Sequence, residues 1–245
     1  MHPIDLPQDV KDRVISRRGK LHLYEDLDPA KSALIVIDMQ NAFMEPGAVA
    51  EVPIAREIVP NINQLADACR DAGGTVAWVQ VTASPKGGPD YWPGLLEHVN
   101  TKERSARFVE ALAEGSHGHA LWPDLVVKDG DMMVKKNRYS AFLPGASDLA
   151  DQLKARDIDT VIITGTLTNV CCESSARDAM MTDFKTIMVS DGNACLRDDE
   201  HLAALSTVLQ VFGDVFSTEE MIGLLSVYQL ASDNGAQHKP TEKSV

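Results

Sequence analysis

The sequence predicts an α/β fold with a mainly parallel sheet, arranged as a single-domain three-layer sandwich of Rossmann-type topology. Short and almost uninterrupted apolar runs, such as SALIVIDMQ at residues 32–40 and TVIITG at 160–165, are typical of strands buried on both faces of a parallel sheet. Segments with helical spacing of apolar residues alternate with these runs, as in βαβ units. The chain of 245 residues is 44% hydrophobic, which is enough for a sizeable core.

The predicted elements follow one another regularly along the chain. Strands are expected at 32–40, at 75–82, within 131–142, at 160–165 and at 185–192. Helices are expected at 58–74, 147–159, 170–183 and 199–213, and residues 214–225 hold a last short strand and helix. Residues 83–103 form a loop with glycine and proline that is long enough for a lid or a binding loop.

The two ends of the chain differ from the middle. Residues 1–30 are polar and irregular, and we expect them to form an N-terminal arm. The middle of the chain, residues 31–230, shows neither an internal repeat nor a change of composition, which predicts one domain. Residues 231–245 have no apolar face, and we expect a flexible C-terminal tail there.

Charge and hydropathy argue against two classes of partner. The net charge is −13 at pH 7, whereas nucleic acids and anionic membranes attract basic surfaces. No apolar run reaches the roughly 18 residues of a membrane span, and the N-terminal segment lacks the apolar core of a signal peptide. We therefore expect a cytoplasmic protein that binds neither nucleic acid nor a membrane.

The four cysteines do not have the spacing of a disulfide framework or of a zinc site. They lack CxxC pairs, and thiols stay reduced in the cytoplasm. Cys171 and Cys172 are adjacent, so a redox sensor that uses vicinal thiols is one alternative. A disulfide between neighbouring residues is strained, which speaks against it.

Polar residues stand at the ends of several predicted strands. Active sites of parallel α/β sheets lie beyond the carboxyl ends of the strands, where Asp38, Gln80, Lys136 and the 165–171 loop are placed. An acid, an amine and a thiol that converge there would make a reactive centre. Asp38 could instead cap a helix, and Lys136 could be a surface charge, so strand position alone leaves these alternatives open. A phosphoacceptor receiver domain would also end a strand in Asp, but receivers are much shorter chains.

The two adjacent cysteines face different surroundings on the predicted helix. Neighbouring residues are about 100° apart around a helix. Cys171 therefore shares a face with polar residues such as Ser174 and Asp178, and Cys172 shares a face with alanines such as Ala176. This pattern predicts that Cys171 is exposed to a polar pocket and that Cys172 is a core residue.

The start of the same helix is expected to activate Cys171. Thr168 or Asn169 has the residue type of an N-cap, and the positive end of the helix would favour a thiolate. A nearby Lys136 would lower the thiol pKa further, and Asp38 could accept the thiol proton. Free backbone N–H groups at a helix start could also hold an oxyanion.

Three separated blocks of the sequence resemble the isochorismatase-like cysteine hydrolase superfamily. They are ALIVIDMQNAF at 33–43, KKNRYSAF at 135–142 and GTLTNVCCESSARDA at 165–179, and the resemblance covers about residues 30–225. It implies a parallel sheet flanked by helices.

The resemblance also implies roles for individual residues. The catalytic residues would be Asp38 as base, Lys136 as the residue that orients it and Cys171 as nucleophile. A non-proline cis peptide would lie between Leu167 and Thr168, and the backbone N–H groups of Thr168 and Cys171 would form the oxyanion hole.

Within that family the sequence looks closest to ureidoacrylate and N-carbamoyl amidohydrolases. This resemblance implies hydrolysis of a C–N bond in a small ureido, carbamoyl or amide compound through a thioester, with release of ammonia or an amine. We expect Asn41, Gln80, Trp92 and Tyr139 to contact the substrate. Another isochorismatase-type hydrolase of a small metabolite is the alternative. Family members are commonly dimers or tetramers, so a homo-oligomer is expected.

The resemblance also bears on metal binding. Nicotinamidases of this family carry a histidine-containing metal site after the second strand, whereas residues 79–92 hold no histidine here. His117 and His119 have the spacing of metal ligands, but we expect them in a solvated loop. The sequence therefore predicts no metal and no cofactor.

Overall fold

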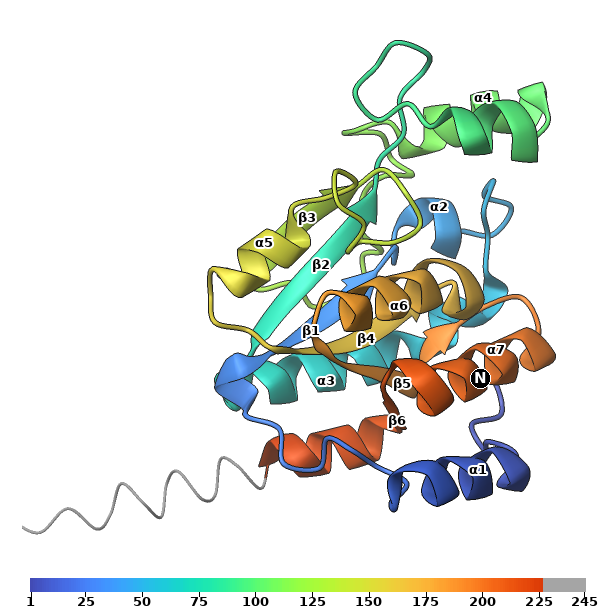
Figure 1. The fold of residues 1–245 in the computed structure, drawn as a ribbon. Helices are drawn as coiled ribbons and strands as arrows, with labels where there is room; N and C mark the ends of the chain where they lie inside the picture. The colour runs from blue at the N-terminus through green and yellow to red at the C-terminus, as the bar shows by residue number, and fades with distance from the viewer. Residues whose placement is uncertain (227–245) are drawn as a thin grey trace, which may run out of the picture.

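The computed structural model describes residues 1–226 and confirms an α/β fold built on one parallel sheet (Figure 1). The strands lie in the order β3-β2-β1-β4-β5-β6, and each neighbouring pair is parallel. Their bounds are β1 Ser32–Ile37, β2 Thr75–Val81, β3 Met132–Lys136, β4 Thr160–Thr166, β5 Lys185–Ala194 and β6 Asp214–Phe216. The strand order reverses between β1 and β4, which is where open sheets of this kind bind ligands.

Helices cover both faces of the sheet, so the predicted three-layer sandwich is confirmed (Figure 1). The α-helices are α1 Gln8–Arg18, α2 Asn41–Met44, α3 Val59–Asp71, α4 Lys102–Leu112, α5 Leu149–Lys154, α6 Glu173–Met181 and α7 Asp198–Thr207. Shorter helical turns are Pro29–Lys31, Pro53–Ile58, Gly94–Val99, Thr168–Cys172 and Val208–Phe212, and residues 218–226 are also helical.

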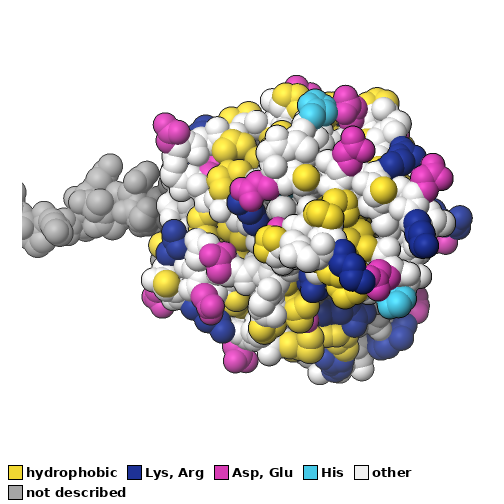
Figure 2. Space-filling model, turned by 90° about the horizontal axis from the view of Figure 1, so that it is seen from above, with side chains coloured by type: hydrophobic (Ala, Val, Ile, Leu, Met, Phe, Trp, Pro, Cys, Tyr) yellow, Lys and Arg dark blue, Asp and Glu magenta, His cyan; other side chains and the backbone are white. Residues whose placement is uncertain are grey.

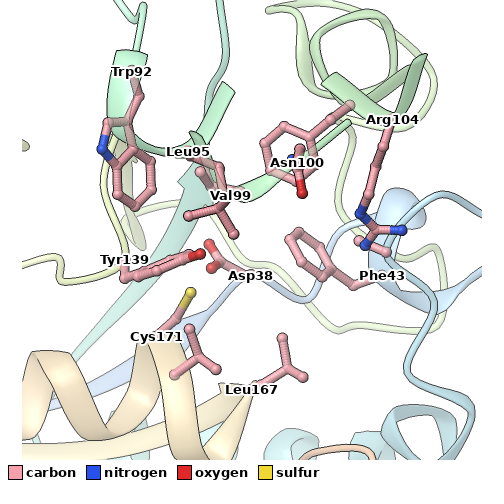
Figure 3. Close-up of a pocket in the computed structure, with 14 residues that line it drawn as sticks. Asp38, Phe43, Trp92, Leu95, Val99, Asn100, Arg104, Tyr139, Leu167 and Cys171 are labelled. Carbon is pink, nitrogen blue, oxygen red and sulfur yellow. The ribbon is translucent and has the colours of Figure 1, made fainter. Parts of the chain in front are cut away.

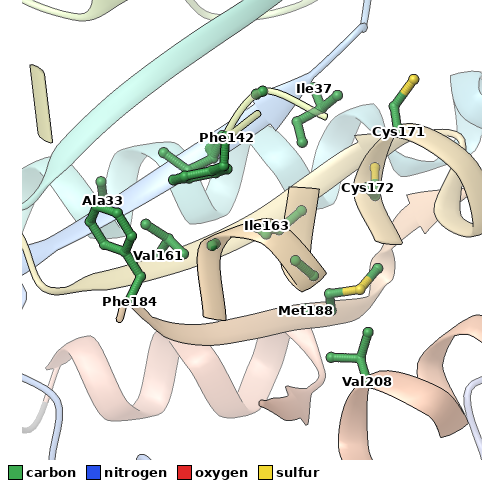
Figure 4. Close-up of a cluster of buried hydrophobic side chains, with 14 of the residues drawn as sticks. Ala33, Ile37, Phe142, Val161, Ile163, Cys171, Cys172, Phe184, Met188 and Val208 are labelled. Atoms are coloured by element: carbon green, nitrogen blue, oxygen red, sulfur yellow. The ribbon is translucent and has the colours of Figure 1, made fainter. Parts of the chain in front are cut away.

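The uninterrupted apolar runs exist because both faces of each central strand are buried. In β1, Ala33, Ile35 and Ile37 join the cluster under α1, α5, α6 and α7, whereas Leu34 and Val36 join the cluster under α3. Figure 4 shows part of the first cluster, packed between the sheet and its helices. Burial on two sides excludes water from the strands and fixes their register.

Three α-helices lie where the sequence predicts none, and the shortest of them is α2. The polar residues 1–30 include α1, whose Val10 and Val14 are buried in the core, so the expectation of an irregular arm is wrong there. Two apolar side chains one turn apart on a charged helix are too weak a pattern to recognise. Helix α4 follows the predicted 83–103 loop, and within that loop Gly94–Val99 forms a helical turn. The tail predicted at 231–245 lies outside the described residues.

None of the helices in the described part of the chain combines the length and apolarity of a membrane-spanning segment.

The end of β4 passes so close to β1 that only glycine fits at position 165. Gly165 has φ +115°, and a Cβ atom there would lie 2.1 Å from the carbonyl oxygen of Ile37. Ile37 directly precedes Asp38, so this contact determines where the first catalytic candidate leaves the sheet. A side chain at 165 would force the two strand ends apart.

We expect Gly165→Ala to destabilise the protein by about 1–3 kcal/mol or more, because it adds positive-φ strain to a backbone clash. Urea denaturation measures the effect. Gly223→Ala is the matched control, since Gly223 has open space around its Cβ position in the 218–226 helix and alanine favours helices. Equal stability of the two variants would contradict this account of Gly165.

Candidate active site

Three strand ends bring Asp38, Lys136 and Cys171 together. Lys136 Nζ lies 2.8 Å from Asp38 Oδ2 and 3.6 Å from Cys171 Sγ. It also donates to the Arg138 carbonyl oxygen at 3.0 Å, so each of the three ammonium protons has an acceptor. The side chains of Asp38 and Lys136 are fully buried.

The backbone around Asp38 is held on both sides. Asp38 has φ +53°, in the left-handed region that aspartate tolerates better than most residues. Its N–H donates to the Val79 carbonyl at 2.9 Å, and its carbonyl accepts from Thr166 Oγ1 at 3.0 Å. Strands β2 and β4 therefore fix the turn that aims the carboxylate at Lys136.

Burial controls the protonation of the three groups. Burial raises the pKa of Asp38, and the Lys136 charge opposes that rise. Burial works against the charge of Lys136, but Asp38 and Cys171 outweigh it and raise the Lys136 pKa. The pKa of Cys171 is also raised, because burial and the Asp38 charge outweigh the effect of Lys136.

The expectation that the resting site favours a thiolate is therefore wrong. The sequence shows the cation beside Cys171 but not the depth of burial, which disfavours a third charge in this site. Lys136 and Asp38 lie at ion-pair distance, and burial, the largest influence on Cys171, favours its neutral thiol. The other carboxylate oxygen, Asp38 Oδ1, is buried without a hydrogen-bond partner among the described residues, so it is available to accept a proton.

The adjacent cysteines have different environments, as predicted, but the expectation of Cys171 exposed to a polar pocket is wrong. Cys171 is buried and its cavity is mostly apolar, because the polar Ser174 and Asp178 line a different groove. Cys171 lines a cavity above the sheet, whereas Cys172 is fully buried with its Sγ 3.9 Å from the Thr164 carbonyl (Figure 4). Both are free thiols. Of the two, only Cys171 lines the cavity.

The turn before Cys171 differs from its predicted geometry in two ways. The helical segment begins at Thr168 with Leu167 as its N-cap, and no side chain caps it, so the prediction of Thr168 or Asn169 as N-cap is wrong. Thr168 Oγ1 instead pairs with His201 Nδ1 at 2.9 Å, because α7 packs against this turn.

The non-proline cis peptide joins Thr166 to Leu167, not Leu167 to Thr168. Without a proline, nothing in the local sequence marks which bond is cis, so the resemblance places it one residue away. The oxyanion hole at the N–H groups of Thr168 and Cys171 stays a prediction.

A cavity of about 260 Å³ opens above Asp38 and Cys171 (Figure 3). Most of its wall is apolar or aromatic, and the polar exceptions besides Asp38 are Asn100 and Arg104. The other lining residues are Phe43, Ala50, Val81, Trp92, Leu95, Val99, Phe108, Tyr139, Leu167, Val170 and Cys171. A cavity of this size and lining suits one small molecule.

The four predicted substrate-binding residues divide into two pairs. Trp92 and Tyr139 line the cavity, with their rings in edge-to-face contact 4.6 Å apart. Asn41 and Gln80 do not line it. Their amides donate to the backbone carbonyls of His117 and His119, at 2.9 and 2.7 Å, and so hold that segment in place.

Sequence reasoning missed the side of the cavity that α4 forms. Arg104 and Phe108 lie four residues apart and line the cavity from one face of that helix. Their spacing of four residues would place both on one helix face, but this is informative only once a helix is assigned to that segment. Phe43, from α2, falls inside the first matched block but carries no polar group to single it out.

The histidines do not gather at the cavity. His117 is exposed and pairs with Glu45 at 3.1 Å, as expected for a solvated loop. His119 is buried, with Nε2 2.9 Å from Thr82 Oγ1, so the solvated-loop expectation is wrong for it. The contact with Thr82, which follows β2, joins residues 37 positions apart in the sequence, so the spacing of the histidines could not reveal it.

One buried group within residues 1–226 has metal-ligand chemistry, namely His2, Cys195 and His201. None of the three lines the cavity. Both ring nitrogens of His2 already have partners, Asp198 Oδ1 at 2.7 Å and the Cys195 N–H at 3.1 Å. The three residues therefore connect the N-terminal segment to α7, and His201 in turn contacts Thr168. The absence of a metal stays a prediction.

Comparison with known proteins assigns the chain to a family. The model of the isochorismatase domain matches residues 32–220, a span that includes Asp38, Lys136 and Cys171. The chain belongs to the isochorismatase family. A cysteine hydrolase from Pseudomonas syringae pv. phaseolicola 1448A is 30% identical, with a TM-score of 0.75 over 85% of this chain and 98% of the other. The predicted membership among isochorismatase-like cysteine hydrolases is confirmed.

Two solved amidases share the isochorismatase-like fold at lower identity. N-carbamoylsarcosine amidase from Thermoplasma acidophilum is 23% identical, with a TM-score of 0.63 over 77% of this chain and 97% of its own. Pyrazinamidase from Pyrococcus horikoshii, solved with zinc, is 22% identical, with a TM-score of 0.64 over 76% of this chain and 99% of its own. At these identities the likeness shows the fold alone.

We expect Asp38→Asn to make Cys171 more reactive toward iodoacetamide at neutral pH. The substitution removes a negative charge that raises the Cys171 pKa and leaves the cation of Lys136 in place. Each pKa unit lost increases the thiolate fraction about tenfold below the pKa. Mass spectrometry of the Cys171 peptide, followed over time and pH, measures the rate.

Melting temperatures of the two proteins control for a loosened fold. Alkylation that is slower in Asp38→Asn than in the original protein would contradict the assignment of a neutral thiol held beside a carboxylate.

Proposed function

We propose that this isochorismatase-family hydrolase is a cysteine-dependent amidohydrolase that cleaves a C–N bond in a small ureido, carbamoyl or amide compound. The observation that carries the proposal is the contact of one buried ammonium, Lys136 Nζ, with both Asp38 Oδ2 and Cys171 Sγ at the floor of a cavity. Two fold neighbours are amidases by name, which supports C–N bonds as the target.

The first half of the proposed reaction forms a thioester. The Cys171 thiol gives its proton to Asp38 as its sulfur attacks the substrate carbonyl carbon, and the carbonyl electron pair moves to the oxygen. The backbone N–H groups of Thr168 and Cys171 would stabilise that oxyanion. When it collapses, the C–N bond breaks and the leaving nitrogen takes the proton from Asp38.

The second half restores the enzyme. Asp38 accepts a proton from water as the water oxygen attacks the thioester carbonyl. The C–S bond then breaks, the acid product forms, and Cys171 recovers its proton from Asp38. Lys136 stays charged throughout, because it must hold Asp38 in place and balance whichever anion, carboxylate or thiolate, is present.

The burial of Asp38 and Cys171 supports these proposed roles of proton acceptor and nucleophile. A carboxylate whose pKa burial has raised is a better proton acceptor than one in water. If Cys171 is a neutral thiol before the substrate binds, no thiolate has to lie beside the Asp38 carboxylate. The proton therefore moves over a short path inside the site, and no group outside it has to titrate.

We expect Cys171→Ala to reduce ammonia release on the order of a thousandfold or more, the scale of losing a covalent nucleophile. Cys172→Ala should keep most of the activity, because Cys172 lies outside the cavity. The assay is ammonia release over a panel of carbamoyl, ureido and simple amide compounds.

The two variants control for each other, since each removes one thiol from the same turn. A dead Cys172→Ala protein with an active Cys171→Ala protein would overturn the assignment of the nucleophile. A panel on which the original protein and Cys171→Ala release ammonia equally would overturn the proposed amidohydrolase.

A further inference from the structure

The cavity contains one cation that its own protein leaves without a partner. Arg104 lines the cavity, and among residues 1–226 its side chain makes no hydrogen bond or ion pair. Figure 3 shows it entering from α4, on the opposite side of the view from Cys171. An arginine fork that faces a small-molecule cavity with its donors free is suited to a carboxylate.

Two hydrogen bonds fix the first turn of helix α4, which carries Arg104. Its backbone N–H donates to Thr101 Oγ1 at 3.2 Å, which caps α4. The next residue, Ser105, is buried and donates to the Leu96 carbonyl at 2.7 Å, which ties α4 to the turn Gly94–Val99. The guanidinium is thus carried by a capped helix whose first turn is fixed to another wall of the cavity.

The wall between Arg104 and Cys171 is apolar. Phe43 and Val99 lie between the two residues in Figure 3, where Asn100 is the polar neighbour of Arg104, and Phe108 also lines the cavity. A polar substrate body would lose its hydration there without recovering hydrogen bonds, whereas an apolar body would not. The cavity therefore has a reactive end, an apolar middle and a cationic end.

Arg104 is an exposed residue at the edge of the cavity, and its charge acts on Tyr139. Burial raises the pKa of Tyr139, and the positive charges of Lys136 and Arg104 oppose that rise. The chain as a whole has a net charge of −13, which repels anions. Figure 2, which looks down on this end of the molecule, shows hydrophobic side chains among charges of both signs and no broad basic field.

We propose that Arg104 selects substrates of the proposed amidohydrolase that carry a carboxylate, separated from the scissile carbonyl by an apolar segment. This inference rests on the proposed function for its chemistry but depends on a different residue. The carboxylate binds the guanidinium, the apolar segment lies along Phe43 and Phe108, and the carbonyl is delivered to Cys171. Neutral amides of the same length lack the first of these contacts.

Two matched pairs of probes test the selection by ammonia release. They are the monoamide of adipic acid against hexanamide, and N-carbamoyl-6-aminohexanoate against hexylurea. We expect kcat/KM for the anionic member to exceed that for its neutral partner on the order of 10- to 100-fold, the range of hydrogen bonds to charged groups. In Arg104→Gln this ratio should fall to about one, and Arg104→Lys should keep part of it.

Arg107→Gln is the matched control. Arg107 lies on the same helix but lines a different surface groove, so its substitution by Gln removes the same charge away from the cavity. The ratio should be unchanged in that variant. Arg104→Glu should shift the preference toward 6-aminohexanamide, which carries a cation at the corresponding position.

Binding to the inactive Cys171→Ala protein separates failure of this inference from failure of the proposed function. Calorimetry with the monoamide of adipic acid should give a Kd that rises about tenfold or more when Arg104→Gln is added and does not change when Arg107→Gln is added. That result supports the inference even if no probe is hydrolysed. Equal effects of the two substitutions, or equal binding of adipic monoamide and hexanamide, would overturn it.

Discussion

The candidate active site depends on a contact between Lys136 and Asp38 that the fold removes completely from water. Transferring Lys136 and Asp38 into the interior costs several kcal/mol per ion, and only close contact and full hydrogen bonding offset that cost. Lys136 meets the requirement with Asp38, Cys171 and the Arg138 carbonyl. The sheet must therefore hold the ends of β1, β3 and β4 in fixed relation, which explains the close passage of Gly165 against Ile37 and the strained turn at Asp38.

The same burial determines the chemistry. Burial and the charge of Asp38 raise the Cys171 pKa, so the proposed reaction requires the thiol proton to leave during the attack. Asp38 has a carboxylate oxygen free of other partners for that proton. A nucleophile that is generated only when a substrate is present is also protected from unwanted reactions, because the resting cysteine is a poor target for electrophiles.

Reaction and recognition are built on different parts of the chain. The sheet carries Asp38, Lys136 and Cys171, whereas the segment after β2, including Trp92 and Arg104, forms the opposite wall of the cavity. Loops and added helices can vary without disturbing a buried sheet, so this division lets one hydrolytic centre serve many substrates. Arg104 belongs to this second part, on helix α4.

The amino-acid sequence by itself determined the alternation of strands and helices, the strand ends that carry Asp38 and Lys136, and the distinction between Cys171 and Cys172. These follow from patterns of period 2 or 3.6 and from strand polarity, which are local properties. Only the tertiary structure decided that Asn41 and Gln80 bind a backbone segment instead of the cavity, and that α4 brings Arg104 over the site. It also decided that the Cys171 pKa rises, because burial arises from all the elements packed around a residue and is not encoded in the few residues beside it.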